Sequence, residues 1–155
     1  MKPAVILAVA CLAATVVSSA TITPNDLFKA VRSSDDSAVA AAIKQGADVN
    51  AREPNGTTPL HYAAYQQDVA LVKRLIAAGA KAKVVNEFGS SPMQEAAVGG
   101  NAAIIGMLLA AGANAESPNS EGQTALMVVA RTGNVEAAKL LLKAGANVNA
   151  IEKFG

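Results

Sequence analysis

Few residues in this 155-residue sequence could carry catalysis. His61 is the only histidine, and Cys11 is the only cysteine. A histidine can act as a general base or a metal ligand, because its unperturbed pKa lies near neutrality. A metal site would need several such ligands, and the sequence contains no cluster of His and Cys residues. No serine lies in a Gly-x-Ser-x-Gly pattern. These observations predict a protein that is not an enzyme and that uses neither a cofactor nor a metal.

Two short motifs allow weaker chemical interpretations. Gly99-Gly100-Asn101 could bind an anion at the start of a helix. No Lys-Ser or Lys-Thr pair follows it, and a turn between two helices explains it better. Asn55-Gly56-Thr57 fits the sequon for N-glycosylation. Asn-Gly is also the strongest dipeptide signal for a hairpin turn, and we favour the turn because it needs no modification.

The composition narrows the classes of fold and partner. Apolar residues make up 52% of the sequence, but aromatic residues only 3%. A core made largely of alanine disfavours a sandwich or barrel, which would use β-branched and aromatic residues. The formal net charge is +1. A near-neutral chain without a basic cluster is not expected to bind nucleic acid.

The first twenty residues have the pattern of a signal peptide. Lys2 is followed by an uncharged run over residues 4–17 and by Ser18-Ser19-Ala20. This pattern predicts cleavage after Ala20 and a secreted or periplasmic protein. The alternative is a retained membrane anchor, although residues 4–17 would span only ~21 Å of the ~30 Å hydrocarbon core as a helix. Cleavage would remove Cys11, so disulfides are not expected to stabilise the mature chain.

Two glycine series reveal an internal repeat. Gly-Ala steps begin at residues 46, 79, 112 and 145, and further glycines lie at 56, 89, 122 and 155, so that both series have a period of 33 residues. Such a period is typical of repeat proteins, in which each unit packs only against its neighbours.

The sequence of each unit predicts two helices, and an extended arm precedes the helices in the later units. A Thr or Ser that can cap a helix opens the first helix, in most units before a proline suited to the first helical position. These openings are Thr23-Pro24-Asn25-Asp26, Thr58-Pro59-Leu60-His61, Ser91-Pro92-Met93-Gln94 and Thr124-Ala125-Leu126-Met127. The first helices are expected to end near Gln67, Gly100 and Gly133. The second helices should run from the caps Asp68, Asn101 and Asn134 to the glycines at 79, 112 and 145. Their apolar residues follow helical spacing: Val69, Val72, Leu75 and Ile76; Ile104, Ile105, Leu108 and Leu109; and Val135, Ala138, Leu141 and Leu142.

On these residues the sequence resembles the ankyrin-repeat family. The family pattern appears as Thr58-Pro59-Leu60-His61 with Ala63-Ala64, as Leu140-Leu141-Leu142, and over residues 145–150. The resemblance implies an all-α repeat solenoid of stacked helix–turn–helix repeats, with β-hairpin fingers at right angles to the helices in L-shaped layers. It also implies that His61 bridges the backbones of neighbouring hairpins. The expected units are an N-terminal capping repeat at 21–51, repeats at 52–84, 85–117 and 118–150, and the start of a further, truncated repeat at 151–155.

The sequence departs from the family pattern in three places, and each departure leads to a separate prediction. The first unit lacks the hairpin and should present Asp35, Asp36 and Lys44 on its outer face. Gly106 and Gly99-Gly100 predict a softer layer over residues 86–117, because glycine within a helix costs about 0.5–1 kcal/mol relative to alanine. Residues 151–155 indicate a piece of a longer array. The alternative is that a partner covers the apolar face of Leu140 to Leu142 and Val148.

The resemblance implies a non-catalytic module that binds a partner protein, not yet identified, through a concave face of hairpin tips and first helices. We expect a monomer with no membrane contact apart from the signal segment. The positions on that face are Arg52, Asn55, Thr57, Tyr65, Gln66, Val85, Glu87, Phe88, Ser90, Val98, Ser120, Glu121, Gln123, Arg131, Thr132, Lys153 and Phe154. Exposed aromatic residues and arginines often anchor interfaces, although Tyr65 and Phe88 could equally pack across adjacent fingers. Two alternatives remain: a targeting or regulatory segment of a longer protein whose enzymatic domain follows residue 155, and a membrane-tethered scaffold.

Overall fold

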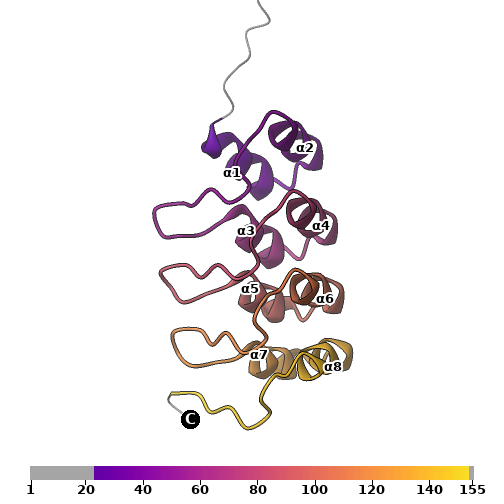
Figure 1. Cartoon of the computed structure of the whole chain (residues 1–155). Helices are drawn as coiled ribbons and strands as arrows, with labels where there is room; N and C mark the ends of the chain where they lie inside the picture. Colours follow the sequence, from indigo (N-terminus) through magenta and orange to yellow (C-terminus); the bar gives the residue numbers. More distant parts are fainter. Residues whose placement is uncertain (1–22, 154–155) are drawn as a thin grey trace, which may run out of the picture.

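The structure, a computed structural model, describes residues 23–153, which form four stacked pairs of helices (Figure 1). The predicted signal peptide at 1–20 and Phe154 lie outside the described residues. Within each pair the first helix lies on the side of the fingers and the second on the opposite side (Figure 1). The first helices are α1 (Pro24–Arg32), α3 (Pro59–Tyr65), α5 (Pro92–Gly99) and α7 (Ala125–Thr132), and the second are α2 (Asp36–Lys44), α4 (Val69–Ala77), α6 (Ala102–Ala110) and α8 (Val135–Lys143).

The second helices begin where the sequence predicts, because each has a side chain that caps its free backbone N–H groups. Asp68 Oδ1 accepts a hydrogen bond from the N–H of Leu71 at 3.0 Å. Asn134 Oδ1 accepts one from the N–H of Ala137 at 3.0 Å. The predicted caps of the second helices in these units are therefore confirmed.

The glycine that follows each second helix allows the chain to turn back. Gly46, Gly79, Gly112 and Gly145 have φ values of 87°, 92°, 84° and 92°. This left-handed conformation is accessible to glycine without steric cost. The four residues adopt the same conformation at the same point of each layer, as expected for one repeated unit.

The hydrophobic core runs continuously between the two columns of helices. Leu75, Leu108 and Leu141, which occupy the same position of successive repeats, are each 0% exposed. Small alanines on the first helices, such as Ala63 and Ala96, are also fully buried and let neighbouring helices approach closely. The described residues therefore form an all-α repeat solenoid.

Several apolar residues of the second helices do not join this core. Val69 and Val135 are 40% and 65% exposed, and each is the first residue of its helix. Leu71, which the spacing did not single out, is buried instead. At the last layer Leu141 is buried, whereas Leu142 and Val148 are 43% and 68% exposed. The predicted apolar face at that end is thus only partly exposed.

Asp35, Asp36 and Lys44 are all exposed in the first repeat, as expected. Asp36 also contacts the second repeat, because both of its carboxylate oxygens accept hydrogen bonds from the guanidinium of Arg74, at 2.6 and 2.7 Å. Asp35 caps α2 by accepting a hydrogen bond from the N–H of Ala38. These two carboxylates hold the first repeat together and attach it to the next.

The fingers have hairpin turns but no strands among the described residues, so the expectation of β-hairpins is only partly met. In the second repeat the N–H of Glu53 donates to the carbonyl of Thr57 at 2.9 Å, and that of Gly56 donates to the carbonyl of Glu53 at 2.8 Å. The returning arm has only Thr57 and Thr58 before α3 begins at Pro59. It is too short for a ladder of strand hydrogen bonds.

No helix within residues 23–153 combines the length and the apolar character that crossing a membrane would require.

Candidate functional site

The buried histidine is part of the framework that holds neighbouring fingers in place. His61 is 2% exposed. Its Nδ1 accepts a hydrogen bond from the N–H of Thr58 at 3.2 Å, which leaves the proton on Nε2 to be donated to the carbonyl of Ser90 at 3.2 Å. Burial lowers the pKa of His61 below its ordinary value. Both ring nitrogens of His61 are thus engaged, and the ring bridges to the backbone of the neighbouring finger, as the resemblance implies.

The equivalent residues of the later repeats show how this bridge varies. Gln94 takes the position of His61 in the third repeat, and its Nε2 donates to the carbonyls of Ser117 and Gln123, both at 2.7 Å. In the fourth repeat the residue is Met127, whose sulfur accepts only from the N–H of Thr124, the residue that caps the same helix. Polar bridges of this kind thus hold the fingers of the third and fourth repeats.

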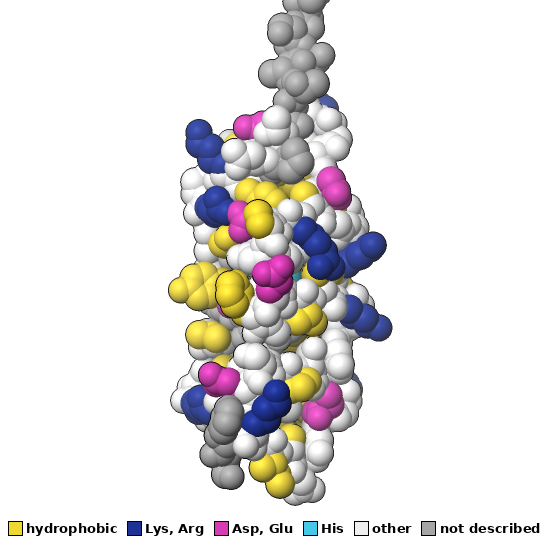
Figure 2. All heavy atoms as spheres, turned by 90° about the vertical axis from the view of Figure 1, so that its left-hand side faces the viewer, with side chains coloured by type: hydrophobic (Ala, Val, Ile, Leu, Met, Phe, Trp, Pro, Cys, Tyr) yellow, Lys and Arg dark blue, Asp and Glu magenta, His cyan; other side chains and the backbone are white. Residues whose placement is uncertain are grey.

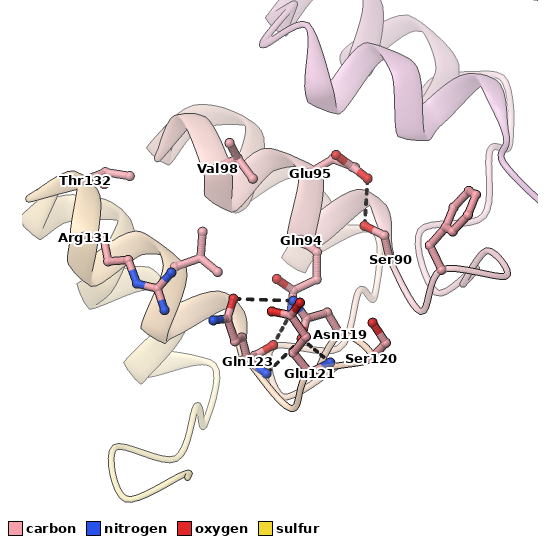
Figure 3. A pocket seen from close by; sticks show the side chains of 12 residues that line it. Ser90, Gln94, Glu95, Val98, Asn119, Ser120, Glu121, Gln123, Arg131 and Thr132 are labelled. Carbon is pink, nitrogen blue, oxygen red and sulfur yellow. Dashed lines mark hydrogen bonds between the residues drawn. The ribbon is translucent and has the colours of Figure 1, made fainter. Parts of the chain in front are cut away.

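A hollow beside the fingers lies between the third and fourth repeats and has a volume of about 540 Å³. Figure 3 shows side chains from α5, α7 and the finger of the fourth repeat around it. We call this hollow the finger groove, and its lining residues are Phe88, Ser90, Gln94, Glu95, Val98, Asn119, Ser120, Glu121, Gln123, Val128, Arg131 and Thr132. Its surface is mixed, with exposed apolar side chains beside amides and carboxylates.

A second hollow lies between the second and third repeats and has a volume of about 270 Å³. We call it the aromatic cavity, and it is lined by Thr57, His61, Tyr62, Tyr65, Asn86, Phe88 and Glu95. Phe88 and Glu95 line both hollows. The finger groove and the aromatic cavity are therefore parts of one surface that continues along the stack.

Comparison with known proteins then decides the family. A family model described as ankyrin repeats (3 copies) matches residues 27–116 and 63–152, which together make up most of the chain. The chain belongs to the ankyrin-repeat family. Ankyrin repeats generally mediate protein–protein interactions and are generally not catalytic. A comparison with curated proteins finds no significant match.

The ankyrin array brings many of the predicted contact residues together on this surface. Those that line the two hollows are Thr57, Tyr65, Phe88, Ser90, Val98, Ser120, Glu121, Gln123, Arg131 and Thr132. Tyr65, Phe88 and Val98 are 64%, 65% and 60% exposed. Tyr65 and Phe88, which could equally pack across adjacent fingers, therefore leave most of their surface exposed.

Other predicted contacts lie elsewhere or are engaged within the array. Thr57 borders the aromatic cavity but is buried, so it is not an exposed contact. Gln66 is half-buried, and its amide donates to the carbonyl of Arg32 at 2.9 Å. Asn55 uses its side-chain oxygen to accept from the N–H of Thr57 within the turn. Glu87 is exposed at its finger, and its N–H donates to the carbonyl of Asn55.

Arg52 and Val85 do not join the predicted face. They line a separate hollow of about 520 Å³ together with Lys81 and Lys83. Figure 2 shows basic side chains at the right-hand edge of the middle of the stack and a hydrophobic cluster at the left-hand edge, with further basic side chains above and below that cluster. Lys153 is exposed, and its Nζ donates to the carbonyl of Ser120 at 2.8 Å.

Sequence reasoning missed Tyr62, Asn86, Gln94, Glu95, Asn119 and Val128, all of which line the hollows. Helical spacing could have found one of them: Glu95 lies three residues before Val98 and therefore on the same face of α5. The buried Gln94 could have been found as the counterpart of His61 in the next repeat.

Within residues 23–153, no group of three His, Cys, Asp or Glu side chains could hold a metal ion.

Proposed function

We propose that this ankyrin array binds a partner protein through the surface formed by the finger groove and the aromatic cavity. The observation that carries the proposal is the exposure of Tyr65, Phe88 and Val98 on one continuous hollowed surface. Three large apolar side chains that remain exposed together are typical of an interaction site.

The framework behind this surface supports binding with little ordering. His61 and Gln94 attach successive fingers through hydrogen bonds, and the cores of neighbouring repeats are continuous. A surface that is already in its binding conformation loses little conformational entropy when a partner binds.

The test replaces both Tyr65 and Phe88 with alanine. The purified chain and this double variant are used to capture proteins from extracts of the organism that produces it. We expect the double variant to retain at most about one tenth of the partner captured by the wild-type chain, because central aromatic residues commonly contribute 2 kcal/mol or more to binding. Its melting temperature should stay close to wild type, since both side chains are largely exposed.

A matched control is provided by Val135→Ala combined with Val148→Ala. These valines are 65% and 68% exposed, close to the values of Tyr65 and Phe88, but they line neither hollow. This control should capture the partner as well as wild type does. An equal loss of partner capture in the two double variants would contradict the proposed surface.

We also propose that the protein is exported and acts in the periplasm or outside the cell. The support is the sequence of residues 1–20, with its basic start, apolar run and small residues before the cleavage position. Export predicts that the protein recovered from its native location begins at Thr21, which amino-terminal sequencing or intact mass measurement would determine. A chain that retains residues 1–20 in the membrane fraction would support a tethered scaffold instead.

A further inference from the structure

The aromatic cavity combines aromatic side chains with a single carboxylate. Tyr62, Tyr65 and Phe88 supply the aromatic side chains, and Glu95 supplies the carboxylate. Aromatic faces attract cations through the quadrupole of the ring, and a carboxylate accepts strong hydrogen bonds from a cationic donor. Both kinds of group therefore attract a positive charge.

No lysine or arginine is among the residues that line the cavity. Two arginines lie close by: Arg32 lies over the ring of Tyr62, and the charge of Arg52 helps to lower the pKa of His61. His61 uses both ring nitrogens for hydrogen bonds to Thr58 and Ser90, and burial lowers its pKa. Glu95 Oε1 accepts a hydrogen bond from the neutral hydroxyl of Ser90 at 2.7 Å. None of the ion pairs within residues 23–153 involves Glu95.

The preceding repeat shows what this combination of groups can hold. The guanidinium carbon of Arg32 lies 4.9 Å from the centre of the Tyr62 ring and 5.8 Å from that of Phe28. Its nitrogen pairs with the carboxylate of Glu53 and donates to the hydroxyl of Tyr62 at 3.3 Å. Two aromatic rings and one carboxylate thus hold an arginine within this chain.

The aromatic cavity offers groups of the same kinds from other positions of the repeat: the residues that follow Phe28, Tyr62 and Glu53 by 33 positions are His61, Glu95 and Asn86. The positions that follow Arg32 by one and two repeats of 33 residues are Tyr65 and Val98. Neither can supply a cation to the aromatic cavity. A cation held between Tyr65, Phe88 and Glu95 would therefore not come from the residues that line the cavity.

We infer that the aromatic cavity receives an arginine side chain of the partner protein, with its guanidinium against Tyr65 and Phe88 and its N–H groups donating to Glu95. This assignment rests on the proposed function, because it describes how the partner would occupy part of that surface. Arginine fits better than lysine, because a planar guanidinium stacks on rings and presents several donors to one carboxylate.

The test is an NMR titration of the 15N-labelled chain with an acetylated and amidated Ala-Ala-Arg-Ala-Ala peptide. We expect saturable shifts that centre on the amides of Tyr65, Phe88 and Glu95. The same peptide with citrulline in place of arginine has nearly the same shape but no charge, and it should cause no saturable shift. The lysine peptide should bind at least about threefold more weakly than the arginine peptide.

Two carboxylate variants separate the cavity from general electrostatic attraction. Glu95→Gln should weaken binding of the arginine peptide about five- to twentyfold. Glu136→Gln removes an exposed carboxylate on α8 and should leave binding unchanged. Equal binding by the citrulline peptide, or equal weakening by the two variants, would overturn the inference. Equal binding by the lysine peptide would overturn the assignment to arginine.

The capture experiment distinguishes failure of this inference from failure of the proposed function. If Tyr65→Ala with Phe88→Ala abolishes capture but Glu95→Gln does not weaken it, the result supports the binding surface and contradicts the arginine site. If the arginine peptide binds at the cavity but capture does not depend on Tyr65 and Phe88, the result supports the arginine site and contradicts the proposed partner surface.

Discussion

Replacing His61 with alanine is expected to lower the free energy of unfolding by about 2–4 kcal/mol. The substitution leaves a cavity where a side chain 2% exposed now lies. It also leaves the N–H of Thr58 and the carbonyl of Ser90 without the hydrogen bonds that they now make to the ring. Urea unfolding followed by circular dichroism measures the difference.

Glutamine provides the matched control, because the chain itself uses Gln94 at the equivalent position to bond two carbonyls of the next unit. His61→Gln should therefore lower the free energy of unfolding by less than half as much as His61→Ala does. The pH dependence adds a second control, since His61 is the only histidine in the sequence and burial holds its pKa below 6.5. Above pH 6.5 the ring is neutral in both states, and its contribution to stability is complete.

As the pH falls below 6.5, the unfolded chain binds the proton first, so stability declines until the pH reaches the lower pKa of the folded state. Melting temperatures between about pH 8 and pH 5 should fall for wild type and stay nearly level for His61→Gln. Asp26 and Asp35 have pKa values below 3.8 because of their capping hydrogen bonds, so their effects come at lower pH. A wild-type melting temperature that does not change over this range would contradict the account of His61.

The helices could be predicted from the sequence because their limits are set by local chemistry. Thr58 and Asp68 cap helices through groups within three residues of themselves, and Gly79 turns the chain through its own φ value. The same kinds of capping residue and turn glycine then recur every 33 residues in four successive units. The family and the solenoid follow from these signals alone.

The binding surface was predicted less well, because it depends on which side of a finger a residue occupies. Neighbouring residues of an extended arm point to opposite sides. Arg52 accordingly lines the hollow that Lys81 and Lys83 also line. Glu53, the next residue, instead accepts a hydrogen bond from the hydroxyl of Tyr62 at 2.7 Å. The repeat period gives the height of both residues in the stack but not the side on which each one lies.

Contacts between repeats were also beyond the sequence pattern. Asp36 and Arg74 are 38 residues apart and form an ion pair that no local motif indicates. Glu95 lies at a cavity whose aromatic side chains come from two different repeats. Such pairings result from how the layers are packed, and a position within one repeat does not specify them.

The second large effect concerns two glycines of the third repeat that the sequence treats alike. Gly106→Ala is expected to stabilise the array by about 0.5–1 kcal/mol, because alanine favours the helix and its added methyl group would meet only Leu140 Cδ1, at 3.6 Å. If Gly106 softens this layer, the same change should slow amide exchange in α6. The softness of residues 86–117 otherwise remains a prediction.

Gly99→Ala is expected to have the opposite sign and to cost about 1–3 kcal/mol. A methyl group at this position would lie 2.2 Å from the side-chain Cδ of Gln67. That side chain cannot move aside freely, because its Nε2 donates to the carbonyls of Ala64 and Glu95 at 2.7 and 3.3 Å. Gly99 is thus required by a contact between two repeats, whereas Gly106 is not.

A double-mutant cycle with Gln67→Gly tests this reason directly. Gln67 has a φ of 58°, a conformation in which glycine is unstrained, and Gly100 and Gly133 occupy the same position of the next two repeats. In the Gln67→Gly background the cost of Gly99→Ala should therefore largely disappear, while the gain from Gly106→Ala should persist. If Gly99→Ala is equally destabilising in both backgrounds, its cost does not come from Gln67. If it stabilises both, helix propensity outweighs packing at the junction between α5 and α6.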